Sequence, residues 1–189
     1  MREVEEDAVD IILTDPPYGV TKNKWDRLLT QDDLNAFTRI TNNIILFSGA
    51  RPDQLKNILN LRPSPARIYI WHYTFSLTNS QGAFWTYQPI YDYGKKLKGL
   101  GKDILVCNCN DKCGKIHPTQ KPIQLMYNLV KHSTIEGEVL LDPFMGSGTT
   151  AAACEKLGRR WIGIEINKDY CEIAKQRIER EIAQLKLAM

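Results

Sequence analysis

The chain contains 189 residues, of which 43% are hydrophobic and 25% charged, with 25 Lys and Arg against 22 Asp and Glu. This length and composition describe one globular domain with a core, which excludes a second full domain and disorder as the main theme. No apolar run approaches the roughly 18 residues of a membrane span. Residues 1–10 carry five acidic residues and one arginine, unlike a secretory signal, so we expect a cytoplasmic protein.

Short β-branched runs alternate with helical patterns along the chain, which is typical of βα units around a largely parallel sheet. In chain order, the pattern predicts strands at 9–14, 43–47, 66–72, 86–93, 103–107, 138–142 and 161–165, and helices at 31–40, 51–61, 122–130, 149–157 and from 169 onward. Pro89 interrupts the fourth of these strands, so we expect that strand to lie at a sheet edge or to carry a bulge. The fold class predicted is α/β, a doubly wound sheet in a single domain.

The first motif that carries chemistry, Asp15-Pro16-Pro17-Tyr18, directly follows the first predicted strand. A doubly wound sheet binds its ligands beyond the carboxyl ends of its strands. The two prolines remove backbone donors and fix φ, so this turn presents a carboxylate, bare carbonyls and an aromatic ring in one rigid arrangement. Such a set can accept two hydrogen bonds from an exocyclic amino group while Tyr18 stacks on the ring that carries it. The alternative is a proline turn with a surface tyrosine.

The second motif follows the strand at 138–142 and runs from Asp142 through Phe144 to the turn Gly146-Ser147-Gly148. It has neither the Gly-x-Gly-x-x-Gly spacing of a dinucleotide site nor the Gly-Lys-Ser/Thr of a phosphate loop. A glycine turn before a helix N-terminus suits the carboxylate of an amino acid attached to a nucleoside. Glu165 closes the next strand 23 residues after Asp142, about where an acid reaches ribose hydroxyls in such βαβ units. A helix cap is the alternative for Glu165.

With these residues, the chain resembles the β-type (permuted) amino-group DNA methyltransferases, which modify adenine N6 or cytosine N4 with S-adenosylmethionine. Residues 15–18 resemble the catalytic motif of that family and residues 142–149 its cofactor motif. His117-Pro118-Thr119-Gln120-Lys121-Pro122 resembles the segment that precedes the cofactor motif. The catalytic motif stands before the cofactor motif, which matches the permuted arrangement.

The resemblance implies a doubly wound, Rossmann-like methyltransferase sheet, the cofactor S-adenosylmethionine and a set of site residues. The implied catalytic residues are Asp15, Pro16, Pro17 and Tyr18. The implied cofactor-binding residues are Asp142, Phe144, Gly146, Ser147, Gly148 and Glu165, with His117, Thr119 and Lys121 near the methionine end. Asp142 either bonds the ammonium group of the cofactor or braces the turn. In the implied mechanism, the Asp15 carboxylate and the Pro16 carbonyl accept the amino hydrogens of a flipped adenine that stacks on Tyr18.

Two alternatives stay open beside an adenine-specific DNA methyltransferase. Aspartate at position 15 favours adenine, but an N4-cytosine enzyme is the first alternative, and a non-catalytic DNA-binding or regulatory subunit is the second. The second alternative rests on the N-terminal region. In the family, a strand that helps to hold the cofactor's adenine usually precedes the catalytic strand, whereas here fourteen residues precede Asp15. We therefore expect weak cofactor affinity for the chain alone.

The stretch at 94–115, rich in glycine, lysine, asparagine and aspartate, is predicted to be a short target-recognition insert whose lysines contact DNA phosphates. RNA as a substrate and self-association as a homodimer stay open. The stretch also holds Cys107, Cys109 and Cys113, with His117 beyond it. Their spacing matches no common zinc finger or ribbon, so we interpret the cysteines as loop thiols and predict no metal.

Overall fold

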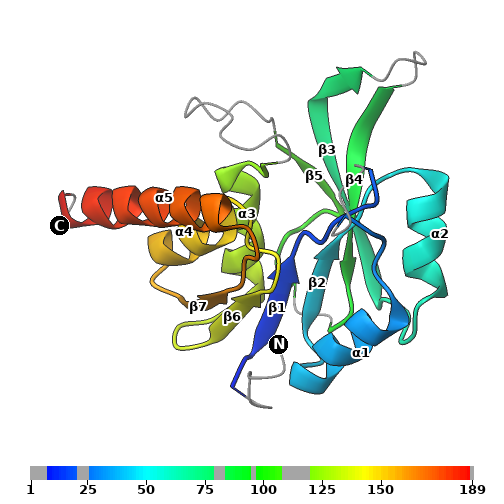
Figure 1. Ribbon diagram of the computed structural model, residues 1–189, viewed down its shortest axis with the longest axis horizontal. Helices are drawn as coiled ribbons and strands as arrows, with labels where there is room; N and C mark the ends of the chain where they lie inside the picture. Colours follow the sequence, from blue (N-terminus) through cyan, green and yellow to red (C-terminus); the bar gives the residue numbers. More distant parts are fainter. Residues whose placement is uncertain (1–7, 21–25, 79–83, 95–96, 108–119, 188–189) are drawn as a thin grey trace.

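The computed structural model describes residues 8–20, 26–78, 84–94, 97–107 and 120–187, with the backbone alone for 74–78 and 84–85. The described strands form one seven-stranded sheet in the order β5-β3-β4-β2-β1-β6-β7 (Figure 1). These strands are β1 Ile11–Thr14, β2 Ile44–Phe47, β3 Arg67–Thr78, β4 Phe84–Asp92, β5 Ile104–Val106, β6 Val139–Asp142 and β7 Arg160–Gly163. The described helices are α1 Gln31–Ile40, α2 Pro52–Asn60, α3 Ile123–Ser133, α4 Thr149–Lys156 and α5 Lys168–Leu187. The predicted α/β fold class is confirmed.

Strand β1 lies at the point where the strand order of the sheet reverses. It pairs in parallel with β2 on one side and with β6 on the other, and β7 continues in parallel beyond β6. Strand β4 runs antiparallel to both β2 and β3, and β5 is parallel to β3, so β3 and β5 run in the same direction as β1. In such sheets the crevice for ligands opens at the carboxyl ends of the strands on either side of the reversal.

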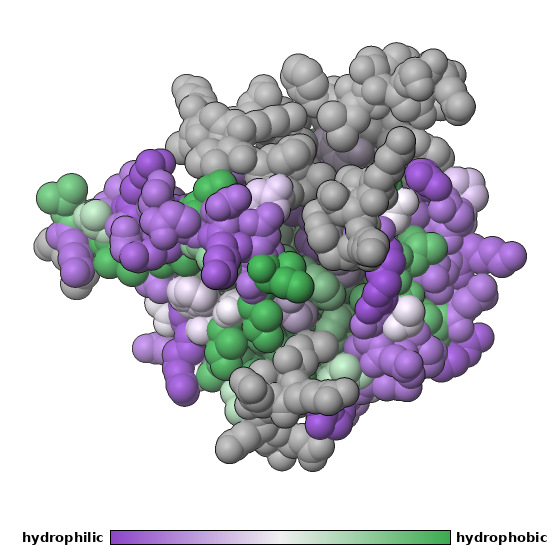
Figure 2. Space-filling view, in the orientation of Figure 1, coloured by the Kyte–Doolittle hydropathy of each residue, from purple (hydrophilic) through white to green (hydrophobic). Residues whose placement is uncertain are grey.

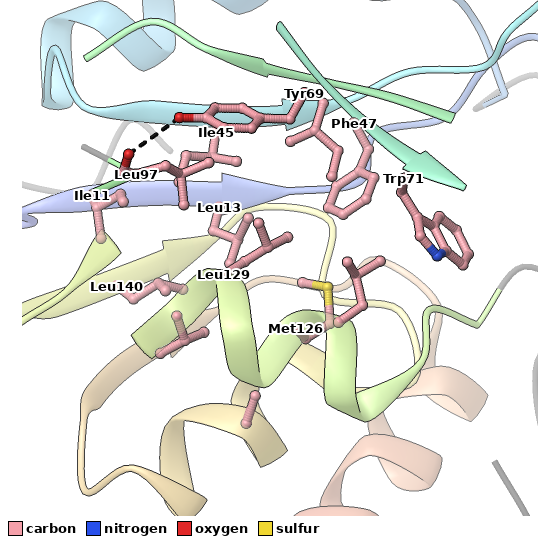
Figure 3. Packing of buried hydrophobic residues seen from close by; sticks show 14 of the residues in the cluster. Ile11, Leu13, Ile45, Phe47, Tyr69, Trp71, Leu97, Met126, Leu129 and Leu140 are labelled. Atoms are coloured by element: carbon pink, nitrogen blue, oxygen red, sulfur yellow. Dashed lines mark hydrogen bonds between the residues drawn. The ribbon is translucent and has the colours of Figure 1, made fainter. Parts of the chain in front are cut away.

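Helices cover both faces of the sheet because alternate strand residues point to opposite faces. In β1, Ile11 and Leu13 belong to one buried cluster and Ile12 to the other. Residues of α3 and α4 complete the first cluster, and residues of α1 and α2 complete the second (Figure 1). Figure 3 shows the first cluster, in which Met126 and Leu129 of α3 pack against the strand residues. The molecule is therefore a three-layer α/β/α sandwich.

Helix α1 begins where the sequence predicts, because Thr30 and Asp33 form a capping box before it. The Thr30 hydroxyl accepts the Asp33 amide at 3.3 Å, and Asp33 Oδ2 accepts the Thr30 amide at 2.8 Å. The Arg27 guanidinium donates to both oxygens of the same carboxylate, at 2.6 and 2.9 Å. These bonds, that from Arg27 above all, lower the pKa of Asp33 to about 2.

Strand β4 is a central strand, so the expectation that Pro89 marks an edge strand is wrong. The pairing of β4 with β3 does carry an irregularity, as the alternative expectation of a bulged strand has it, although Pro89 itself pairs in regular register with Ile70. The register irregularity of the β3–β4 pair falls between His72 and Leu77 of β3. The carbonyl of Pro89 accepts the Ser48 amide at 3.2 Å, and in an antiparallel strand the nitrogen and carbonyl of one residue face the same neighbour. The nitrogen of Pro89 thus faces β2, which ends at Phe47. A proline fits there because no ladder donor is needed.

Helix α5 packs on α4 and continues past it (Figure 1). Ala174 is the fully buried residue among those described in this helix. Figure 2 shows hydrophilic side chains predominating over α5 and, on the opposite side of the view, over α2. Among the helices that the structure describes, none has the length and apolar character needed to cross a bilayer.

Candidate active site

The two predicted motifs meet at the carboxyl edge of the sheet. Thr14, the last residue of β1, donates its hydroxyl to Asp142 Oδ1 at the end of β6 over 2.8 Å. The two strands pair in parallel with Ile12 opposite Leu141, so the segments that leave them start side by side. A contact between residues 128 positions apart in the chain thus joins the Asp-Pro-Pro-Tyr turn to the glycine turn.

Buried polar side chains hold the backbone around Tyr18. Both oxygens of Asp26 accept backbone amides, that of Gly19 at 2.7 Å and that of Val20 at 3.0 Å. The side-chain amide of Gln54 donates to the Tyr18 carbonyl at 3.0 Å. Asp26 and Gln54 are 8% and 2% exposed. Hydrogen bonds with two buried side chains, Asp26 and Gln54, therefore hold the turn that carries the aromatic ring.

Gln54, on α2, is a site residue that sequence reasoning missed. Its Oε1 accepts the Arg51 amide at 3.1 Å while its nitrogen reaches Tyr18. A Cβ at Gly49 would lie 1.9 Å from this Oε1, so glycine is required where the Gln54 side chain passes. The sequence could have pointed to Gln54 through its position, because Gln54 lies one helical turn before the buried Ile58 and therefore on the apolar face of α2.

Lys121, which the resemblance sets near the methionine end of the cofactor, contacts Asp15 in this chain without ligand. Its ammonium donates to Asp15 Oδ2 in an ion pair whose side chains are 7% and 21% exposed. The same nitrogen lies 5.6 Å from the ring centre of Tyr18, 5.1 Å from that of Phe47 and 5.9 Å from that of Trp71. Attraction to these three aromatic faces adds to the ion pair. Lys121 thus links the segment before α3 to the predicted catalytic motif.

Asp142 is buried and accepts three hydrogen bonds within the chain. It accepts the Thr150 hydroxyl at 2.6 Å, the Thr14 hydroxyl at 2.8 Å and the Phe144 amide at 3.1 Å. Burial raises the pKa of Asp142 to about 6, although these three hydrogen bonds favour the charged form and counteract part of the rise. These contacts brace the turn, which is one of the two roles that the sequence leaves open.

The two glycines of the turn serve different purposes. Gly146 has a φ of 53°, and a Cβ there would meet no atom closer than 4.0 Å, so the space beside it is open. Gly148 has a φ of 75°, and a Cβ there would lie 2.8 Å from the Cβ of Ala174. Gly148 therefore allows α5 to approach the start of α4, whereas Gly146 leaves room for a ligand. Ser147 between them is buried.

Glu165 connects the glycine turn to the entry of α5. Its Oε2 accepts the Gly146 amide at 2.8 Å, and its Oε1 accepts the Asn167 amide at 2.8 Å. A carboxylate oxygen has two lone pairs, so each oxygen can accept one more bond from a hydroxyl. Phe144 lies nearby in the same turn, partly exposed and edge-on to Phe37 with 6.5 Å between ring centres.

These groups fit a nucleoside that carries an amino acid. Glu165 can accept ribose hydroxyls, the partly exposed Phe144 offers an apolar face, and the open space at Gly146 admits a close approach of the ligand to the backbone. Helix α4 starts at Gly148 with no side chain capping it, and the positive end of its dipole favours a carboxylate. The donor and acceptor set is thus that of a site for S-adenosylmethionine.

Other predicted residues fall outside this site or outside the described chain. His117 and Thr119 lie outside the described residues, as do Cys109 and Cys113. In the described part of the chain, no group of three His, Cys, Asp or Glu residues is arranged to hold a metal. A cavity of about 460 Å³ lined by Arg67, Tyr69 and Lys102 lies at the opposite edge of the sheet, where β3 begins. It contains none of the predicted site residues.

The strand order and the place of the glycine turn are those of the Rossmann-like methyltransferases that use S-adenosylmethionine. A sequence model of the DNA methylase family matches residues 37–176, and the chain belongs to this family. It is thus an amino-group DNA methyltransferase with S-adenosylmethionine as its cofactor, as the motifs predict. The matched residues include the glycine turn and begin after residues 15–18.

Individual relatives agree with this assignment. The type II methyltransferase M2.DpnII of Streptococcus pneumoniae is 28% identical over 232 aligned positions, which cover 96% of this chain and 86% of that protein. The aligned stretch exceeds the 189 residues of this chain, so the relative contains residues that this chain lacks. The crystal structure of the M1.HpyAVI–SAM complex is similar with a TM-score of 0.67 at 28% identity, covering 89% of this chain and 88% of that one.

A further structural neighbour shows the fold alone. The PvuII DNA methyltransferase, described as cytosine-N4-specific, has a TM-score of 0.66 at 16% identity and covers 97% of this chain and 86% of its own. An enzyme with that specificity therefore shares this fold. The target base has to be argued from the site rather than from the architecture.

Proposed function

We propose that this chain transfers the methyl group of S-adenosylmethionine to the N6 amino group of a flipped adenine in DNA. The observation that carries the proposal is the hydrogen bond from Thr14 to Asp142, because it sets the Asp15 turn beside the turn suited to the cofactor. The cofactor supplies an electrophilic methyl group when it is bound. The chain supplies acceptors for the amino hydrogens and a surface for the base.

The role proposed for Asp15 is electrostatic and positional. The lone pair of an adenine amino nitrogen is delocalised into the ring, so the nitrogen is a poor nucleophile. If the Asp15 carboxylate and the Pro16 carbonyl each accept one hydrogen, the nitrogen can pyramidalise and direct its lone pair at the methyl group. The negative charge of Asp15 also stabilises the positive charge that develops on the nitrogen during transfer.

The base has to leave the duplex to reach this turn. Tyr18 is proposed to stack on the flipped base, and the bonds from Asp26 and Gln54 to the surrounding backbone support this role because they hold the ring in place. A ring fixed in advance loses little conformational freedom when the base binds. We also propose that the enzyme acts in the cytoplasm, where it meets its DNA.

The structure favours only the later part of the 94–115 segment for contact with DNA. Lys98 and Lys102 are exposed, but they precede β5, which runs parallel to β3 and so begins at the edge opposite Asp15. Hairpin β3–β4 instead extends beyond the carboxyl edge, on the side of the proposed site (Figure 1). We propose that this hairpin, together with the later part of the segment, contacts DNA around the flipped base. Residues 108–115 lie outside the described chain.

The test is transfer of labelled methyl to DNA and RNA oligonucleotides, followed by mass spectrometry of the nucleosides. We expect N6-methyladenine in DNA from the wild type, and a rate lower by about a hundredfold or more in Asp15→Asn, since the charge next to the reacting nitrogen is lost. Asp32→Asn is the matched control, because Asp32 is an exposed acid in the first turn of α1.

Three outcomes would contradict the proposal. N4-methylcytosine as the product would replace adenine by cytosine as the target. Methylation of RNA alone would replace the substrate. Full activity in Asp15→Asn would remove the proposed role of this carboxylate.

A further inference from the structure

Lys121 is paired with the carboxylate that the proposed mechanism needs, at one of its two oxygens. Its ammonium donates an N–H to Asp15 Oδ2, and the target amino group would donate an N–H to the same carboxylate. The lysine is held by Tyr18, Phe47 and Trp71 in addition to the ion pair. In the ligand-free chain, the ammonium thus bonds the same carboxylate that the amino group of the target would use.

The ion pair is incompatible with efficient transfer. The target nitrogen gains positive charge as it takes the methyl group, and a lysine ammonium bonded to Asp15 would oppose that change. Screening by salt is weak because the Lys121 side chain is only 7% exposed. Opening of the pair before the chemical step would remove this opposition.

An ammonium group that leaves a buried carboxylate needs another anion nearby, because an unpaired buried charge is costly. The neighbouring acids Asp142 and Glu165 are already held by hydrogen bonds within the chain. A further anion expected at this edge, and the one that arrives with the ligand, is the amino-acid carboxylate of S-adenosylmethionine, next to the start of α4. Lys121 precedes α3, which packs on α4.

We propose that Lys121 exchanges between two carboxylates, that of Asp15 in the cofactor-free protein and that of the cofactor once it is bound. This proposal rests on the proposed function, which gives Asp15 its role. By leaving Asp15, Lys121 frees Oδ2 for the target amino group. Lys121 is therefore a positioning residue that acts through Asp15, and it makes readiness for the base depend on prior cofactor binding.

The test is a double-mutant cycle on cofactor-site affinity, measured by calorimetry with S-adenosylhomocysteine, which has the carboxylate but no sulfonium charge. Asp15→Asn keeps the size and an acceptor oxygen but releases Lys121, so we expect binding to tighten by about three- to tenfold. In a Lys121→Met background, we expect the same substitution to cause no tightening. An equal effect of Asp15→Asn in both backgrounds would overturn the exchange.

A second measurement avoids any change at Lys121. Wild type and Asp15→Asn are compared with S-adenosylhomocysteine and with its decarboxylated form. Tightening should appear only for the ligand that bears the carboxylate, and equal tightening for both ligands would overturn the proposal. Asp32→Asn should bind both ligands as the wild type does.

The outcome can be separated from that of the proposed function, because the cycle measures binding and the labelled-methyl assay measures transfer. Methylation by the wild type together with an additive cycle would overturn the exchange alone. A coupled cycle without methylation of DNA would support the exchange and contradict the proposed function.

Discussion

Replacing Asp142 with asparagine is expected to stabilise the protein at neutral pH relative to the wild type. Asp142 is buried, and its pKa is raised from 3.8 to about 6. Below about pH 3 the carboxyl is protonated in both the folded and the unfolded chain, so its ionisation does not affect the free energy of unfolding. Above about pH 6 it is ionised in both, and the folded chain bears the full cost of a buried charge.

The size of the effect follows from the change in the pKa of Asp142 on folding. A pKa higher by about two corresponds to about 3 kcal/mol in the free energy of unfolding, which the wild type loses as the pH rises from about 4 to about 6. Asparagine has no charge to bury. Its oxygen can keep the bonds from Thr14 and Phe144, and its amide can donate to the Thr150 hydroxyl, so the contacts of the turn persist.

The assay is thermal unfolding of both proteins, without ligand, between about pH 4 and about pH 7.5. We expect the melting temperature of Asp142→Asn to rise relative to the wild type by up to roughly 6–12 °C across this range. Asp33→Asn is the control, because the pKa of Asp33 is lowered to about 2 and its contribution changes only below this range. A constant difference between Asp142→Asn and the wild type, or a difference that shrinks as the pH rises, would refute the reasoning.

Two further predictions concern packing and DNA contact. Gly148→Ala should lower the free energy of unfolding by roughly 2–4 kcal/mol in chemical denaturation, because a positive φ and a clash with Ala174 add together. Gly158→Ala, at a φ of 61° with no atom within 4 Å, should show only the smaller strain cost, so equal losses would contradict the packing argument. Lys102→Ala should leave DNA affinity and its salt dependence unchanged, whereas Lys112→Ala, from the later part of the same segment, should weaken both in binding titrations. If DNA binding by Lys102→Ala depended less on salt concentration than that of the wild type, Lys102 would contact DNA, and the whole 94–115 segment would again be the proposed DNA-binding region.

The sequence by itself determined the elements and the class of the protein. Hydrophobic periodicity located most strands and helices to within a few residues. Apolar residues recur about every second position in a strand and every third or fourth in a helix, and a short stretch of sequence is enough to tell these patterns apart. For strand β3 the pattern predicted the end too early, at residue 72 rather than Thr78. The motifs at 15–18 and 142–149 were recognisable because the chemistry of each resides in consecutive residues.

Only the tertiary structure decided which distant residues meet. The sequence does not indicate that Lys121 meets Asp15, which the fold brings about. Likewise, Gln54 reaches the site because α2 lies beside the Tyr18 turn. Pro89 is accommodated in a central strand because β2 ends beside it. Lys102 lies away from the site because β5 runs parallel to β3. Pairing, direction and burial depend on the whole sheet, and no local window of sequence contains them.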